Sequence, residues 1–88
     1  MKGTGREKEI ERVQIGARME KTLVKTLKGL AEYLDLSLGD LLEGITLHAL
    51  EGKAPFSPET LAQIKKLRAV YGLTLAASDS HKLVETKS

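Results

Sequence analysis

The sequence predicts a mostly α-helical fold with one short strand, assembled as a homodimer and extended at its C-terminus by another helix. Apolar and polar residues alternate over residues 12–19, which is typical of a half-buried strand. The apolar period then lengthens to that of an amphipathic helix over residues 20–35, and again over residues 38–52. Ser, Pro and Glu at residues 57–59 mark the start of a further helix.

Length and composition limit the class of protein. The chain has 88 residues, 41% of them hydrophobic, and no cysteine. A single domain of this size has a modest core, and no disulfide or thiolate metal site supports it, so dimerisation is the remaining common route to stability. No apolar run reaches the roughly 20 residues of a membrane span, and the N-terminus lacks the apolar segment of a secretory signal. We expect a cytoplasmic protein that has no membrane contact and needs no cofactor.

The N-terminal region is expected to consist of a flexible arm, residues 1–11, followed by the strand. A lone strand cannot satisfy its own backbone hydrogen-bonding groups, and the chain offers no second strand. The expected partner is therefore the same strand of a second copy. Successive side chains of a strand lie on opposite faces. The apolar face holds Val13, Ile15, Ala17 and Met19, and the polar face holds Arg12, Gln14, Gly16 and Arg18.

Two amphipathic helices follow the strand. The first spans about residues 20–35, and we expect a poorly capped start because Glu20 is not a favoured N-cap residue. Ser37 is a good N-cap for the second helix, and Asp40 completes a carboxylate variant of the capping box. Apolar residues cover most of this second helix, which indicates burial on more than one side and hence a second subunit. The predicted dimer core holds Val13, Ile15, Ala17, Met19, Leu23, Leu27, Leu34, Leu41, Leu42 and Ile45.

Residues 53–88 form the predicted C-terminal extension, with a helix over about residues 58–71 and a polar tail. Pro58 suits the first position of this helix, and Gly72 suits its C-terminal cap. Its apolar stripe has the spacing of a helix that binds in a groove of a partner protein. The same stripe could equally pack on the body of the dimer. It consists of Leu61, Ile64, Leu67 and Val70.

The order of a strand, a helix, a tight turn with a serine cap and a second apolar helix resembles the ribbon-helix-helix family of DNA-binding repressors, of the Arc and MetJ type. The resemblance covers residues 12–52 and rests on the alternation from Val13 to Met19, the helical stripe after it, and Leu36-Ser37 leading into the next helix. It implies an intertwined homodimer whose two strands pair into an antiparallel ribbon that enters the DNA major groove. The chain departs from the family at Gly16, at Glu20, and at Asp35, which occupies the usual glycine position of the turn.

Four residues on the polar face are the candidates for base contacts. Arg18 can bind guanine and Gln14 can bind adenine with two hydrogen bonds each. Arg12 lies at the edge of the strand, where a phosphate contact is as plausible. Gly16 either allows close approach of DNA to the backbone or simply relaxes the twist of the strand. The alternative is an ordinary solvated strand face. The predicted phosphate contacts come from the free N–H groups that open the second helix, at Ser37, Leu38 and Gly39.

The sequence therefore predicts a homodimeric transcriptional repressor that binds double-stranded DNA in a sequence-specific manner. One alternative is an antitoxin whose C-terminal helix binds a toxin through Leu61, Ile64, Leu67 and Val70, and another is a structural helical dimer without a DNA role. We predict no enzyme activity, because the run from Ser78 to His81 has the residue types of a catalytic triad without its geometry. His48 and His81 do not have the spacing of a metal site.

Overall fold

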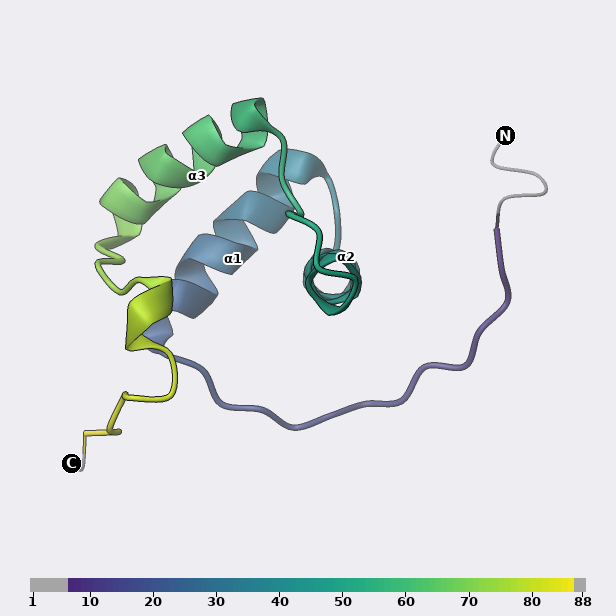
Figure 1. Ribbon diagram of the computed structural model, residues 1–88, viewed down its shortest axis with the longest axis horizontal. Helices are drawn as coiled ribbons and strands as arrows, with labels where there is room; N and C mark the ends of the chain where they lie inside the picture. The colour runs from purple at the N-terminus through teal and green to yellow at the C-terminus, as the bar shows by residue number, and fades with distance from the viewer. Residues whose placement is uncertain (1–6, 87–88) are drawn as a thin grey trace.

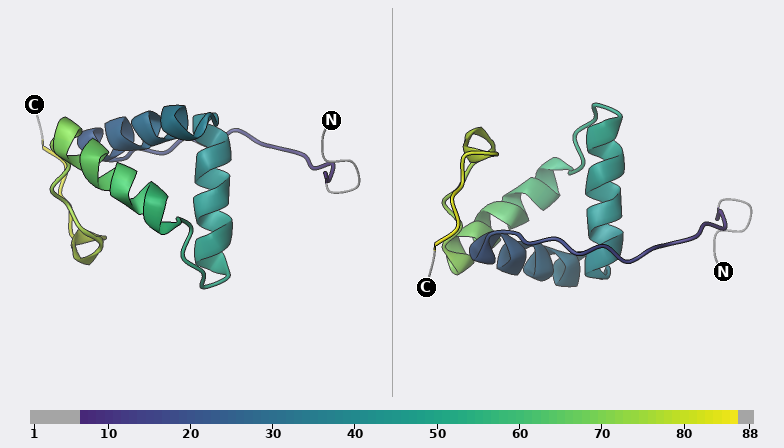
Figure 2. Two further views of the ribbon diagram at one scale, coloured as in Figure 1. Left: turned by 90° about the horizontal axis from the view of Figure 1, so that it is seen from above. Right: turned by 90° about the horizontal axis from the view of Figure 1, so that it is seen from below.

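The computed structural model describes residues 7–86, which form a small three-helix domain with an extended segment at each end. The helices are α1 (Lys21–Leu34), α2 (Leu38–Leu50) and α3 (Pro58–Tyr71), followed by the short 3₁₀-helix η1 (Ala77–Asp79) (Figure 1). Helix α1 packs against both α2 and α3, whereas the backbones of α2 and α3 do not approach each other. The helices lie along three sides of a triangle (Figure 2). None of them combines the length and apolar character required to cross a membrane.

The prediction of a strand at residues 12–19, and with it of a ribbon-helix-helix fold with an intersubunit ribbon, is wrong for this structure. Residues 7–86 contain no strand, and residues 7–20 form an irregular extended segment, called here the N-terminal segment. Within residues 7–86, the backbone of residues 8–19 makes no hydrogen bond to another extended segment. An alternating pattern predicts that one face of a strand is apolar and the other polar. A strand also needs a neighbouring strand that accepts and donates its backbone hydrogen bonds. The mostly helical character is confirmed.

Helix α1 has caps at both ends that differ from the usual residue choices. The Glu20 carboxylate accepts hydrogen bonds from the Leu23 backbone N–H, at 2.9 Å, and from the Thr22 hydroxyl, at 2.6 Å. The expectation of a poorly capped start is therefore wrong, because the longer glutamate side chain folds back onto the first turn. At the other end Asp35 adopts the left-handed conformation, with φ of 60°, that usually favours glycine.

The other two helices begin with the serine caps that their sequences predict. The Ser37 hydroxyl accepts a hydrogen bond from the Asp40 N–H at 3.1 Å, and the Ser57 hydroxyl accepts one from the Thr60 N–H at 3.2 Å. Helix α3 ends at Gly72, which has φ of 70°. Its bounds agree with the helix predicted over residues 58–71.

The core lies where α1 meets the other two helices. Leu30, Ala31 and Leu41 are buried at its centre, with exposed fractions of 4% or less. Thr26 is also buried, and its hydroxyl donates to the Thr22 carbonyl oxygen at 2.8 Å. Half-buried side chains from all three helices and the α2–α3 connection surround this centre: Leu27, Leu34, Ile45, Phe56, Ile64 and Leu67. The buried centre is small for a chain of this length.

Candidate nucleic-acid interface

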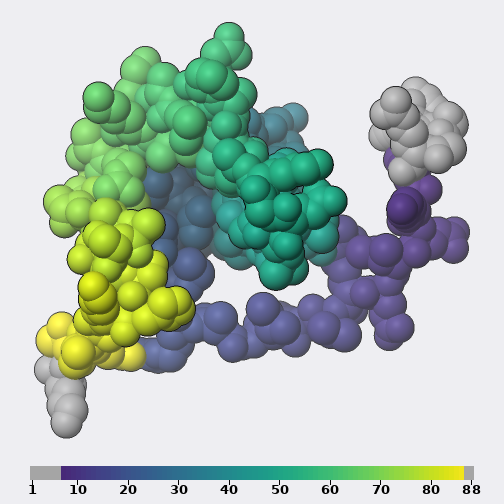
Figure 3. Space-filling view, viewed as in Figure 1, coloured from purple at the N-terminus to yellow at the C-terminus, as the bar shows by residue number. Residues whose placement is uncertain are grey.

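The N-terminal segment carries all four predicted base-contacting residues, and residues 11–19 are exposed throughout. In the space-filling view it crosses beneath the helices, from the C-terminal segment to beyond α2 (Figure 3). Val13 and Ile15 are each 79% exposed, and Met19 is 47% exposed. Neither the polar nor the apolar side chains of the segment are buried within this chain. Both sets are therefore accessible to a partner.

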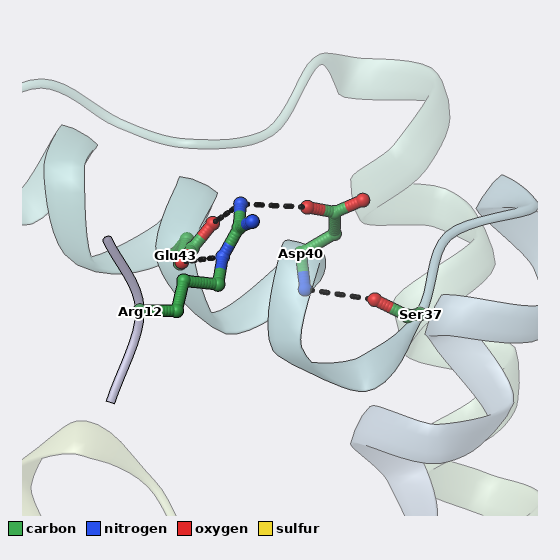
Figure 4. Close-up of polar contacts among 4 residues, drawn as sticks. All are labelled: Arg12, Ser37, Asp40 and Glu43. Carbon is green, nitrogen blue, oxygen red and sulfur yellow. Dashed lines mark hydrogen bonds and ion pairs between the residues drawn. The ribbon is translucent and has the colours of Figure 1, made fainter. Parts of the chain in front are cut away.

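Arg12 joins the N-terminal segment to α2 through a two-pronged ion pair. Its Nε donates to Glu43 Oε2 at 2.7 Å, and its Nη2 donates to Glu43 Oε1 at 2.9 Å. Asp40 Oδ1 lies 3.9 Å from the same Nη2 (Figure 4). These hydrogen bonds lower the pKa of the Glu43 carboxyl and raise the pKa of Arg12. Two carboxylates of α2 thus face one guanidinium of the N-terminal segment.

Arg18 forms a second ion pair, with Glu85 near the C-terminus. Both side chains stay well exposed, at 82% for Arg18 and 69% for Glu85. The carboxylates that pair with the two arginines come from separate parts of the chain. Sequence reasoning missed Glu43 and Glu85, because they lie 31 and 67 positions from their arginines and no local pattern links them.

Gln14 and Gly16 lie between the two arginines, and both are exposed. A side-chain Cβ placed on Gly16 would meet no atom within 4 Å. The backbone at Gly16 is thus open to close approach. The structure places the four predicted base-contacting residues on one continuous exposed segment, in the order Arg12, Gln14, Gly16 and Arg18.

The predicted phosphate site at the start of α2 has acidic surroundings. The Ser37 hydroxyl is occupied by its own helix cap, Leu38 is half-buried and Gly39 is exposed. Asp40 and Glu43 follow within the next helical turn. Their negative charges oppose the attraction that free N–H groups and the helix dipole exert on an anion. A phosphate contact here would depend on Arg12, which lies against the same two carboxylates.

The predicted dimer-core residues divide into two groups. Leu41 is buried and the other helical members are half-buried. Of this group, the residues in or packed against the core of the single chain are Leu27, Leu34, Leu41 and Ile45. The members on the N-terminal segment are all exposed. The helical group consists of Leu23, Leu27, Leu34, Leu41, Leu42 and Ile45, and the exposed group consists of Val13, Ile15, Ala17 and Met19.

Helix α2 also exposes apolar side chains beyond its contact with α1. Leu47 is 67% exposed and Leu50 is 81% exposed. They follow Glu43 by about one and two helical turns, so they continue the face of α2 that Arg12 contacts. This α2 face, formed by Glu43, Leu47 and Leu50, has apolar side chains that no other described part of the chain covers.

The apolar stripe of α3 is partly used within the chain. Ile64 and Leu67 pack against the core, whereas Leu61 is 52% and Val70 is 72% exposed. The four residues therefore do not form one free face. Among residues 7–86 there is no group of three or more side chains that could together hold a metal ion.

No family model, curated protein or solved structure matches the chain.

Proposed function

We propose that the chain is a homodimeric transcriptional repressor that binds double-stranded DNA through its N-terminal segment. The observation that carries the proposal is the exposure of residues 11–19, where Arg12, Gln14 and Arg18 alternate with apolar residues. Guanidinium and amide side chains are those best shaped to bind base edges in the major groove. The open backbone at Gly16 supports close approach of a ligand between Gln14 and Arg18.

A second copy of the chain is the proposed occupant of the exposed apolar surface. The buried centre of the single chain is small, and domains of this size often need a further source of stability. Leu47 and Leu50 on α2, with Val13 and Ile15 on the N-terminal segment, are large apolar side chains left largely in water. Exposed apolar side chains that gather into a patch mark association sites. Burial against a second copy would complete the core.

The DNA part of the proposal is tested by fluorescence anisotropy with a labelled duplex of random sequence. We expect Arg18→Ala to weaken binding, and Lys66→Ala, which removes an exposed cation from α3, to serve as the control for loss of one positive charge. Binding of the wild type should weaken steeply between 50 and 200 mM salt, because DNA binding releases the counterions of each neutralised phosphate. Equal binding by the wild type and Arg18→Ala at every salt concentration would exclude Arg18 as a contact.

The dimer part is tested by sedimentation equilibrium over a range of protein concentrations. Leu50→Glu places a charge on the α2 face and should shift the protein toward the monomer. Ala62→Glu introduces the same charge at an exposed position of α3 and should leave the dimer intact. A monomeric wild type, or equal dissociation of the two variants, would contradict the proposed interface.

The structural helical dimer without a DNA role has one observation in its favour. Arg12 and Arg18 both pair with carboxylates of their own chain, which lowers the positive potential around the N-terminal segment. The DNA titration separates the two functions, since this alternative predicts no salt-dependent binding to any duplex. The antitoxin alternative retains only Leu61 and Val70 as exposed members of its docking stripe.

A further inference from the structure

Both arginines of the N-terminal segment pair with carboxylates of their own chain, and the Arg12 pair has the geometry of a phosphate contact. Glu43 binds the Arg12 guanidinium through both oxygens, at 2.7 and 2.9 Å, with Asp40 at 3.9 Å behind it. Phosphate oxygens bind guanidinium with the same paired geometry. Glu85 occupies Arg18 in turn. The two arginines proposed to contact DNA are therefore already engaged within the chain.

We propose that Glu43 and Glu85 are internal competitors of DNA, which hold the N-terminal segment against the protein body until phosphate or base groups displace them. This inference rests on the proposed function. It assigns to the two carboxylates a regulatory role that is separate from that of the arginines. Asp40 adds to the negative charge at the Arg12 end and strengthens the competition there.

The ion pairs are suited to displacement because they are exposed. The side chain of Arg12 is 63% exposed and that of Glu43 is 43% exposed. Exposed pairs contribute little to stability and are weakened by salt, so an incoming phosphate replaces them at small cost. Salt also weakens the internal competitor. The affinity of the wild type for DNA should consequently fall less steeply with salt than the affinity of a variant without the carboxylates.

The first test measures the internal contact without DNA. Limited trypsin digestion followed by mass spectrometry reports cleavage after Arg12 and after Arg18 in the full chain. We expect Glu43→Gln to accelerate cleavage after Arg12, and Glu85→Gln to accelerate cleavage after Arg18, each by about twofold to fivefold. Glu51→Gln is the control, because it removes an exposed carboxylate at the C-terminal cap of α2 that pairs with Lys53 instead. Equal cleavage in all variants would overturn the proposal.

The second test measures DNA affinity of the same variants by fluorescence anisotropy with the labelled duplex. Relative to Glu51→Gln, we expect each of Glu43→Gln and Glu85→Gln to bind about twofold to fivefold more tightly. In an Arg12→Ala background, Glu43→Gln should give no gain over Glu51→Gln, since the group it releases is absent. If Glu43→Gln and Glu85→Gln both bind DNA with the affinity of the wild type, the proposed competition is wrong.

The two tests distinguish failure of this inference from failure of the proposed function. If no variant and no wild-type protein binds any duplex, DNA binding is wrong, and the proteolysis still decides whether the carboxylates hold the N-terminal segment. If the wild type binds DNA and the carboxylate variants behave like Glu51→Gln in both assays, the proposed function stands and the internal competition is wrong.

Discussion

Gly29 of α1 lies against side chains of α3, and adding one methyl group there tests that packing. A Cβ at Gly29 would lie 3.1 Å from Tyr71 Cε2 and 3.2 Å from Leu67 Cδ2. Replacing an interior helical glycine by alanine gains about 1 kcal/mol of helix stability. Overpacking costs about 1–3 kcal/mol. We therefore expect Gly29→Ala to lower the free energy of unfolding by about 1 kcal/mol, the balance of the two effects.

Gly44→Ala is the matched control, because a Cβ at this interior position of α2 would meet no atom within 4 Å. It should gain the helix contribution alone and stabilise the protein by about 1 kcal/mol. Urea unfolding followed by far-UV circular dichroism measures both variants. The protein concentration is kept constant, since self-association would make stability depend on it. Equal stabilisation by Gly29→Ala and Gly44→Ala would refute the close packing of α1 against α3.

Three further variants test the caps and the core. Asp35→Gly should raise the free energy of unfolding by about 0.5–1 kcal/mol in urea titrations, because glycine adopts φ of 60° without strain, and a loss of stability would contradict the left-handed cap. Hydrogen bonds from the Thr22 hydroxyl and the backbone of Thr22 and Leu23 lower the pKa of Glu20 below its ordinary 4.5, so its contribution to stability is present above that pH and is lost as the pH falls through the lowered pKa. The difference in melting temperature between the wild type and Glu20→Gln should accordingly shrink from pH 7 to pH 3, and a constant difference would count against the cap. Leu30→Ala should destabilise by about 2–5 kcal/mol in urea, because Leu30 is 2% exposed, and a change below about 1 kcal/mol would place Leu30 outside the core.

The helices could be predicted because their determinants are local. Serine caps at Ser37 and Ser57, the proline at position 58 and the apolar period fix where α2 and α3 begin. Local determinants could not decide whether residues 12–19 form a strand, since the alternating pattern does not specify a hydrogen-bonding partner. The same sequence that suits a strand is irregular and extended where no neighbour pairs with it.

Of the candidate site, the sequence predicted the side chains of the N-terminal segment but not their surroundings. Alternation separated Arg12 and Arg18 from the apolar positions, and the structure leaves both groups exposed. Their pairing with Glu43 and Glu85 depends on how distant parts of the chain fold together. The N-cap preferences of residue types predict a poor cap at Glu20. Its side chain nevertheless caps α1, because it reaches back to the first turn of the helix.

Helices α2 and α3 both pack against α1, as two branches of the domain that share one core. Within the described residues, neither branch relies on backbone contact with the other. Residues 46–50, the second half of α2, are exposed, so this half can open locally while Leu41 stays in the core. Amide hydrogen exchange should consequently be faster in the second half of α2, from Thr46 onward, than in the centre of α1 around Leu30.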